Sequence, residues 1–109
     1  MNNDQNALVS IGIPTFNRPE MLINAIEIIR GQTYKNLEII ISDNASSIPL
    51  VKKILKKYID LDSRIKCYFQ TENIGILANT SFVLSKASGD YFMWFSDDDW
   101  RAPEFIEYM

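Results

Sequence analysis

The residues with the clearest chemistry are three consecutive aspartates, Asp97, Asp98 and Asp99, which directly follow an apolar run and Ser96. Carboxylates this close repel one another, and no Lys or Arg lies beside them before Arg101. Hard divalent cations bind carboxylate oxygens and complete their coordination with water and phosphate oxygens. The aspartates therefore favour a Mg²⁺ or Mn²⁺ site, and the alternative is an exposed acidic turn before another helix.

Polar residues also collect where the other short apolar runs end. In a parallel sheet, the carboxyl ends of the strands share one edge, and open α/β sheets bind ligands at that edge. We therefore treat these polar ends as one candidate site. They comprise Pro14, Thr15, Phe16 and Asn17 after the first run, Asp43 after the second, and Asn73 and Gly75 after the third.

Each of these ends also has a purely structural interpretation. The Asp43 carboxylate could accept the imide N–H of a uracil ring or a ribose hydroxyl, but Asp43 and Asn44 equally suit an Asx turn and cap. Asn73 with Gly75 suits either a tight turn or a close backbone approach to a ligand. Taken singly, the turn is the better interpretation at both places, and only their shared position favours a site.

The elements that position these residues follow from the alternation of short apolar runs with longer amphipathic ones, which is typical of βαβ units. Right-handed crossovers then predict a doubly wound α/β fold, a mainly parallel sheet with helices on both faces. The continuous apolar run 91–95 predicts a central strand covered on both faces, with Trp94 in the core. Strands are predicted over 8–14, 37–43, 64–69 and 91–95, and helices over about 18–31, from Ser46 or Ser47 to Ile59, and over 74–87.

Two helix starts and one helix face are predicted in more detail. Asn17 is the expected N-cap of the first helix, ahead of Pro19, and Ser46 or Ser47 is expected to open the second. The second helix carries lysines at 52, 53, 56 and 57. We expect these lysines to form a solvated face, because charged runs at helical spacing usually do.

Composition limits the classes of function. The chain has 109 residues, 47% of them hydrophobic, which suits one core and a single domain. Its net charge of −3 argues against a nucleic-acid partner. Histidine is absent and Cys67 is the single cysteine, which removes imidazole triads and most zinc sites. Residues 1–7 are expected to be a disordered tail, and without an apolar run of membrane-spanning length we expect a cytoplasmic protein.

Four stretches resemble, in order, the family 2 glycosyltransferases, which have the GT-A fold and are inverting enzymes that use nucleotide-diphospho sugars. These stretches are 9–18, 32–46, 73–75 and 89–99. The resemblance implies that residues 1–109 are the N-terminal nucleotide-binding part of one glycosyltransferase domain.

Length is where the chain departs from that family. Family members continue well beyond the position of Met109, and the resemblance places their acceptor site and their carboxylate general base in that later part. No catalytic residue is therefore assigned within residues 1–109, and the general base is expected beyond Met109. The resemblance implies a truncated chain that is inactive alone.

The resemblance also implies a role for each site residue. The turn 14–17 would contact base and ribose, Asp43 would recognise the base, and Asn73 and Gly75 would pass beside the base. Ser96 stands where many members have the first aspartate of a D-x-D motif. Asp98 is then the expected direct metal ligand, with Asp97 near the ribose or the metal's waters and Asp99 in support.

The function implied by the resemblance is metal-dependent transfer of a sugar, from a UDP-sugar by preference, to a hydroxyl of a saccharide or lipid-linked acceptor. The setting would be polysaccharide biosynthesis in the cytoplasm or at the inner face of the membrane. One alternative is a metal-dependent phosphatase or receiver-type domain, but those place key acids at the end of the first strand. The other is a non-catalytic nucleotide- or metal-binding module that self-associates through an exposed sheet edge.

Overall fold

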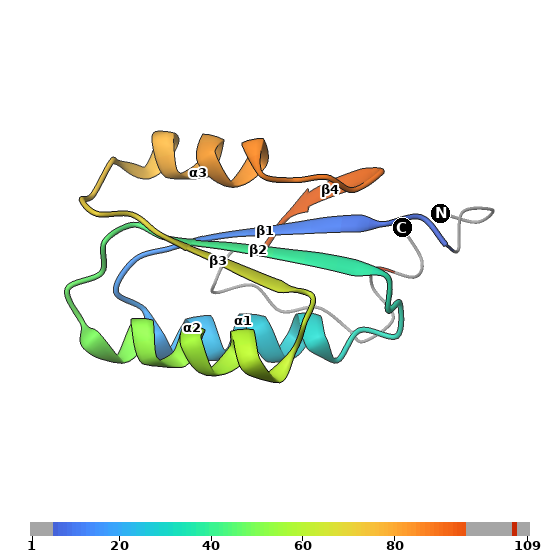
Figure 1. Ribbon diagram of the computed structural model, residues 1–109, viewed down its shortest axis with the longest axis horizontal. Coiled ribbons are helices and arrows are strands. Elements are labelled where there is room, and N and C mark those ends of the chain that lie inside the picture. Colours follow the sequence, from blue (N-terminus) through green and yellow to red (C-terminus); the bar gives the residue numbers. More distant parts are fainter. Residues whose placement is uncertain (1–5, 96–105, 107–109) are drawn as a thin grey trace.

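The computed structural model describes residues 6–95 and residue 106. The described strands form one parallel sheet in the order β3-β2-β1-β4, with β1 and β2 in the centre (Figure 1). The strands are β1 (Val9–Thr15), β2 (Leu37–Asp43), β3 (Ile65–Phe69) and β4 (Tyr91–Trp94), and the helices are α1 (Pro19–Arg30), α2 (Pro49–Leu61) and α3 (Ile76–Ser85). Residues 1–5 of the predicted tail lie outside the described residues.

The helices lie on both faces of the sheet. Figure 1 shows α1 and α2 side by side below the strands and α3 above them. This arrangement confirms the predicted doubly wound α/β fold, and each predicted strand and helix is present with ends shifted by a few residues. No helix within the described ranges is long and apolar enough to cross a membrane.

The core lies mainly between the central strands and the α1–α2 layer. β2 is buried along its whole length and β1 along nearly all of it, as continuous apolar runs in a parallel sheet should be. On the opposite face, α3 packs closely on β1 at Gly12. A Cβ atom there would lie 2.6 Å from Val83 Cγ1 and 2.7 Å from Phe92 Cζ, so this close approach needs glycine.

The predicted central position of the fourth strand is wrong for the described sheet. β4 pairs with β1 alone and lies at the edge, and Trp94, expected in the core, is 41% exposed. Only Phe95, just after the strand, is fully packed. The physical reason is that an apolar run shows which side chains favour burial but not which elements bury them. Within the described part of the chain, other elements pack against β4 on one side only.

The predicted helix caps also differ from those observed. The N-cap positions are Arg18 and Ile48, neither of which caps through its side chain, and Pro19 and Pro49 open the two helices. Proline supplies no N–H at the first position, so part of the need for a cap disappears. Asn17 instead bonds the chain that leads into α2, as described below.

A buried carboxylate joins strands at the amino edge of the sheet. Glu38 on β2 accepts hydrogen bonds from Ser10 Oγ (2.7 Å) and Lys66 Nζ (2.6 Å). Ser88 donates from both its backbone N–H (2.9 Å) and its hydroxyl (2.8 Å). Burial alone would raise the pKa of Glu38, but these bonds together lower that pKa to about 2. Since Gly89 N–H also donates to Ser10 Oγ (2.8 Å), the entrance to β4 is fixed to β1 and β2.

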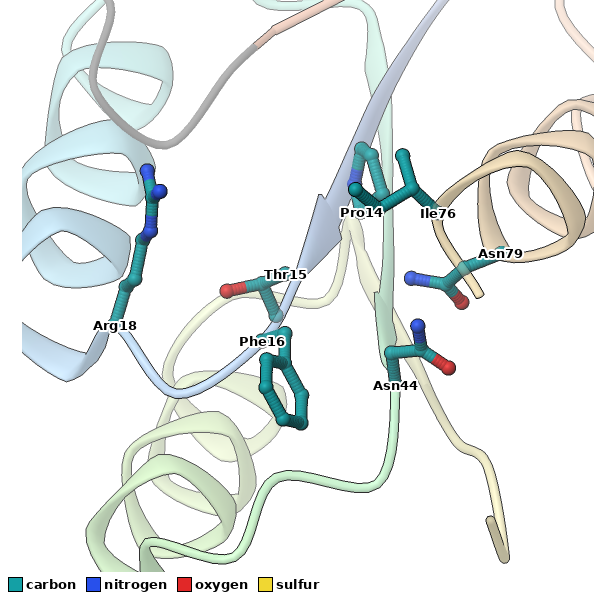
Figure 2. Close-up of a pocket in the computed structure, with 7 residues that line it drawn as sticks. All are labelled: Pro14, Thr15, Phe16, Arg18, Asn44, Ile76 and Asn79. Carbon is teal, nitrogen blue, oxygen red and sulfur yellow. The ribbon is translucent and has the colours of Figure 1, made fainter. Parts of the chain in front are cut away.

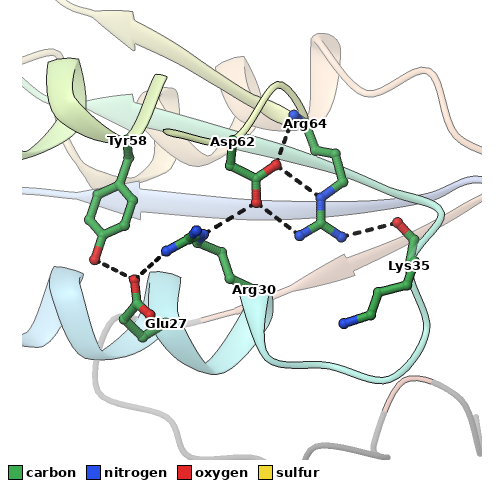
Figure 3. A network of polar contacts seen from close by, with 6 residues as sticks. All are labelled: Glu27, Arg30, Lys35, Tyr58, Asp62 and Arg64. Atoms are coloured by element: carbon green, nitrogen blue, oxygen red, sulfur yellow. Dashed lines mark hydrogen bonds and ion pairs between the residues drawn. The ribbon is translucent and has the colours of Figure 1, made fainter. Parts of the chain in front are cut away.

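A second polar network fastens α1 to α2 (Figure 3). Glu27 accepts hydrogen bonds from Tyr58 (2.6 Å) and Arg30 (2.8 Å), and Arg30 also reaches Asp62 at 3.3 Å. Arg64 binds the same Asp62 carboxylate at 2.9 Å. The bonds from Arg64 outweigh the effect of burial and lower the pKa of Asp62 to about 2. This network orients the two helices beneath the sheet.

Candidate functional site

A pocket of about 380 Å³ opens at the carboxyl edge of the sheet. It lies between the end of β1, the start of α1, the end of β2 and the start of α3 (Figure 2). Three of the predicted site residues, Pro14, Thr15 and Phe16, line it. The other lining residues are Arg18, Asn44, Ile76 and Asn79.

Asn17 follows β1 in a left-handed turn, with φ of 51°, and bonds the chain after β2. Its backbone N–H donates to Ser46 Oγ (2.8 Å), and its side-chain Nδ2 donates to Ser47 Oγ (3.1 Å). Its Oδ1 accepts from the N–H of Ile48 (3.1 Å). Asn17 is therefore placed to hold two edge loops together, and it is not among the pocket-lining residues.

Asp43 ends β2 beside Thr15, its partner in the parallel register, and is 3% exposed. Its Oδ1 accepts hydrogen bonds from the backbone N–H (3.2 Å) and the hydroxyl (2.5 Å) of Ser46. Asp43 therefore stabilises the turn after β2 by binding the residue three positions on, whereas an Asx turn would bind the residue two positions on. The other oxygen of Asp43, Oδ2, accepts no hydrogen bond from residues 6–95. Because every fully buried side-chain oxygen in this range has a hydrogen-bond partner, Oδ2 must be in contact with the surface.

The loop containing Asn73 and Gly75 is held by a residue that sequence reasoning did not include in the site, the buried Asn44. Asn44 Nδ2 donates to Asn73 Oδ1 (3.2 Å) and to the Gly75 carbonyl (3.3 Å). Asn44 Oδ1 accepts from the N–H of Ile74 (2.9 Å). Gly75 has φ of 88°, with open space around the position of a Cβ, so the glycine serves backbone conformation. Loop and pocket thus share Asn44.

Asn79 was also missed, and it secures α3 to the sheet. Its Oδ1 accepts from Ser42 Oγ (2.6 Å) and its Nδ2 donates to the Ser42 carbonyl (3.1 Å), and both groups are buried. Gln70 Nε2 donates to the same hydroxyl at 3.1 Å. The sequence carried no signal for this role, because Asn79 is followed by two more polar residues, Thr80 and Ser81. Arg18 and Ile76, the remaining lining residues that were missed, carried none either.

The aspartates 97–99 and Ser96 lie outside the described residues, so their predicted metal-binding roles stay predictions. The chain reaches them from a defined place, because Phe95 N–H donates to the Gly12 carbonyl at 2.9 Å. Gly12 is on the strand that leads to Pro14 and the pocket. Elsewhere in the described ranges, no group of three or more His, Cys, Asp or Glu residues could hold a metal ion.

The expected position of the general base, beyond Met109, also stays a prediction. Met109 itself lies outside the described residues, and Ile106 is the last residue that the structure places. The backbone N–H of Ile106 donates to Gln32 Oε1 at 3.1 Å, and its side chain is buried in the core. The chain at Ile106 is therefore held near the end of α1.

The remaining group near the site is Cys67, whose thiol lies on β3. Burial, with a smaller contribution from the charge of Asp43, raises the pKa of the Cys67 thiol to about 12. The sulfur lies 4.0 Å from the Leu55 carbonyl beneath the sheet. A thiol this weakly acidic is a packing group and has no nucleophilic role.

Comparison with known proteins identifies the family. The pattern of glycosyl transferase family 2 matches residues 10–109. An uncharacterised glycosyltransferase of Rickettsia typhi is 37% identical over 106 residues, covering 97% of this chain and 32% of the relative. A GalNAc(5)-diNAcBac-PP-undecaprenol β-1,3-glucosyltransferase of Campylobacter jejuni is 40% identical over 93 residues, covering 84% and 29%. The chain thus spans about a third of the length of these relatives.

Solved structures agree on the fold. A Pyrobaculum calidifontis mannosyltransferase, in complex with GDP-Man and Mn²⁺, superposes with a TM-score of 0.78 at 21% identity, covering 87% of this chain and 29% of that one. S. aureus TarS residues 1–349, in complex with UDP, superposes with a TM-score of 0.82 at 19% identity, covering 92% and 30%. With its parallel sheet and GT-A neighbours, the chain has the fold of an N-terminal GT-A portion and belongs to glycosyl transferase family 2.

Proposed function

We propose that this chain holds the donor nucleotide and a divalent metal ion in an inverting glycosyltransferase, which transfers a sugar from a nucleotide-diphospho sugar to an acceptor hydroxyl. The observation that carries the proposal is the pocket at the carboxyl edge, next to the fixed Asp43, whose Oδ2 accepts no hydrogen bond from residues 6–95. Neighbouring structures that hold UDP or GDP-Man in the same fold support it.

We assign base recognition to the two loops that follow β1 and β2 at the carboxyl edge. Asp43 Oδ2 would accept the imide N–H of uracil, which is why a UDP-sugar is the favoured donor. Phe16, 43% exposed at the pocket, offers a ring face for stacking. Asn73 and Gly75 would pass beside the base, because Asn44 sets their loop against the pocket.

The metal would be Mn²⁺ or Mg²⁺, bound by Asp98 and Asp99 with Asp97 near the ribose. The donor chemistry fits, since adjacent carboxylates suit hard cations. The described residues offer no rival acidic cluster. When bound, the metal would stabilise the departing diphosphate. The bond from Phe95 N–H to the Gly12 carbonyl fixes, next to β1, the last described residue before these aspartates.

The acceptor half is assigned to the part of the family length beyond Met109, which this chain does not span. A carboxylate general base there would deprotonate the acceptor hydroxyl. We therefore propose that residues 1–109 alone bind nucleotide weakly and transfer no sugar. A saccharide or lipid-linked acceptor and a cytoplasmic setting, at the inner face of the membrane, complete the proposal. The name of the Campylobacter relative, which refers to an undecaprenol-linked saccharide, supports the acceptor class.

Calorimetric titration of UDP, with Mn²⁺ and with chelator, tests the donor site. We expect metal-dependent heat that Asp98→Ala abolishes and that Asp43→Asn weakens about tenfold, the value of one lost hydrogen bond to a buried carboxylate. Asp60→Asn, on the exposed side of α2, is the charge-matched control and should bind normally. Equal binding by all variants would refute the assigned roles, and binding unchanged by chelator would refute the metal.

A second candidate is a self-associating module without catalysis. It is favoured by the outer edge of β4, which pairs with no other described strand and where Tyr91 is 46% and Trp94 is 41% exposed. Unpaired parallel edges and apolar patches promote association between copies. Sedimentation velocity over a range of concentrations tests it. A dimer that Trp94→Lys dissolves, in a protein unresponsive to UDP, would favour this candidate over the donor site.

A further inference from the structure

The outward side of α2 is a concentrated positive surface. Four lysines, at positions 52, 53, 56 and 57, are all exposed there and form what we call the lysine face. The opposite side of the same helix is buried against the sheet through Val51, Leu55 and neighbouring residues. The single acidic residue exposed with them on this helix is Asp60. α2 is therefore amphipathic, with a strongly basic outer face.

The lysine face is not neutralised within the described part of the chain. Arg30, Arg64 and Lys66 each form ion pairs, at 3.3, 2.9 and 2.6 Å. None of the four lysines on α2 forms one within residues 6–95, and Lys52 Nζ lies over the Phe69 ring, 5.4 Å from its centre. The whole chain has 14 acidic residues against 11 basic ones, so this local excess runs against its net charge.

Apolar side chains flank the lysine face. Leu50 is 50% exposed, Leu61 is 54% exposed and Ile59 is 39% exposed. The apolar face of α2 itself is buried in the core, but exposed aliphatic residues beside lysines let a surface combine apolar contact with attraction to anionic lipids. Lysine stems can extend along apolar surface while the ammonium groups reach lipid phosphates. A nucleic acid would use the charges and leave the aliphatic residues in water, which makes it the weaker candidate.

The position of α2 leaves the candidate site free during such binding. α2 lies with α1 in the layer below the strands (Figure 1). Its first end approaches the carboxyl edge, where the N–H of Ile48 donates to Asn17 Oδ1. The pocket opens at that edge between β1, β2 and the starts of α1 and α3, and no residue of α2 lines it. A surface in contact with the lysine face would therefore lie beside the pocket without closing it.

We propose that the lysine face of α2, with its aliphatic flanks, docks this protein onto an anionic lipid bilayer. The lysine ammonium groups contact phospholipid phosphates, and Leu50 and Leu61 enter the interfacial region. Each lysine near an anionic surface contributes enough to change affinity about fivefold. Binding should weaken steeply as salt screens the charges. This docking does not depend on the proposed donor site.

Vesicle co-sedimentation tests the proposal, with vesicles of phosphatidylcholine alone or mixed with phosphatidylglycerol. We expect binding to the mixed vesicles only. The double variant Lys53→Gln/Lys57→Gln should bind at least tenfold more weakly, at unchanged thermal stability. The matched control Lys35→Gln/Lys86→Gln removes the same charge from exposed positions elsewhere and should bind normally. Equal loss in both variants, or equal binding to neutral vesicles, would overturn the proposal.

Two further arms identify the ligand. Leu50→Ser/Leu61→Ser should also weaken vesicle binding, because a bilayer uses the aliphatic flanks, and binding unchanged by that variant would overturn the interfacial contact. Inorganic phosphate at matched ionic strength should not compete, and competition would assign the lysines to a free phosphate ligand instead. Tighter binding to a duplex oligonucleotide than to mixed vesicles would assign them to nucleic acid. UDP titration of the same variants should be normal, which separates this result from the donor site.

Discussion

Glu38→Gln tests whether one buried carboxylate holds the sheet together at its amino edge. The substitution keeps the size of the side chain but removes its charge. It also replaces one carboxylate oxygen by an amide N–H₂, which cannot accept the two hydrogen bonds made there. These come from Ser10 and the Ser88 N–H at Oε1, or from Lys66 and the Ser88 hydroxyl at Oε2. The outer strand β4 follows directly on Ser88 and Gly89, so the change should loosen the path that leads to residues 96–99.

The magnitude follows from the pKa of Glu38. A value of about 2, against an ordinary 4.5, corresponds to about 3 kcal/mol of stability at neutral pH. Lys66 is 53% exposed, so solvent and salt screen part of that interaction. We therefore expect Glu38→Gln to lower the free energy of unfolding by about 2 kcal/mol at pH 7.

The sign of the pH dependence is fixed by the direction of the shift. Because the folded pKa lies below the unfolded one, the contribution of Glu38 is fully present above about pH 4.5. It is lost as the pH falls through about 2. Urea unfolding of both proteins, at several values between pH 7 and pH 2, measures this directly. The stability difference between wild type and variant should shrink towards the acid end.

Two results would refute the reasoning. One is a stability difference that stays constant down to pH 2, which would mean that the variant loses stability through altered packing and not through the lost charge. The other is no difference at pH 7. Lys66→Met offers a partial check, since it leaves the bonds from Ser10 and Ser88 in place and should cost less than Glu38→Gln.

The remaining predictions concern the site and the core. Gly12→Ala should lower the denaturation midpoint, at a cost of about 1–3 kcal/mol, because its Cβ would lie 2.6 and 2.7 Å from side chains of α3 and β4; a midpoint equal to wild type would contradict this packing. Ser46→Ala should weaken UDP binding severalfold in calorimetry by releasing the Asp43 carboxylate, whereas Ser47→Ala should have little effect. Cys67, with a pKa of about 12, should resist a thiol reagent at pH 8 until the protein is unfolded, and rapid labelling of the folded protein would count against its burial.

Periodicity and turn chemistry were enough to predict the elements and the sheet edge at which the site lies. The buried runs of β1 and β2 and the amphipathic pattern of α2 carry local signals that survive in the folded chain. Asp43 was placed at this edge for the same reason, as a polar residue at the end of a buried strand, and its role in the candidate site stays a prediction. Strand order along the sheet was inferred less well, since the apolar run of β4 could not show which neighbours cover it.

The residues that were missed act through contacts between distant segments. Asn44 bonds a loop about thirty residues away, and Asn79 bonds Ser42, 37 residues away. Asn17 was expected to cap its own helix but bonds the loop before the next one. Such partners have no local pattern, because they exist only once the sheet has brought the loops together. Tertiary hydrogen bonds were therefore the part that one sequence could not predict.

The strand order also determines when each strand can pair during translation. Of the described strands, β1 leaves the ribosome first and pairs on one side with β2, which follows closely, but its other side waits for β4. The residues that meet there, Leu8 and Asp90, are 82 positions apart. Until then, the nascent chain carries a long, apolar, unpaired strand edge of the kind that invites aggregation. Chaperone contact during translation should accordingly be strongest before Tyr91–Trp94 emerges and should fall once that strand has docked.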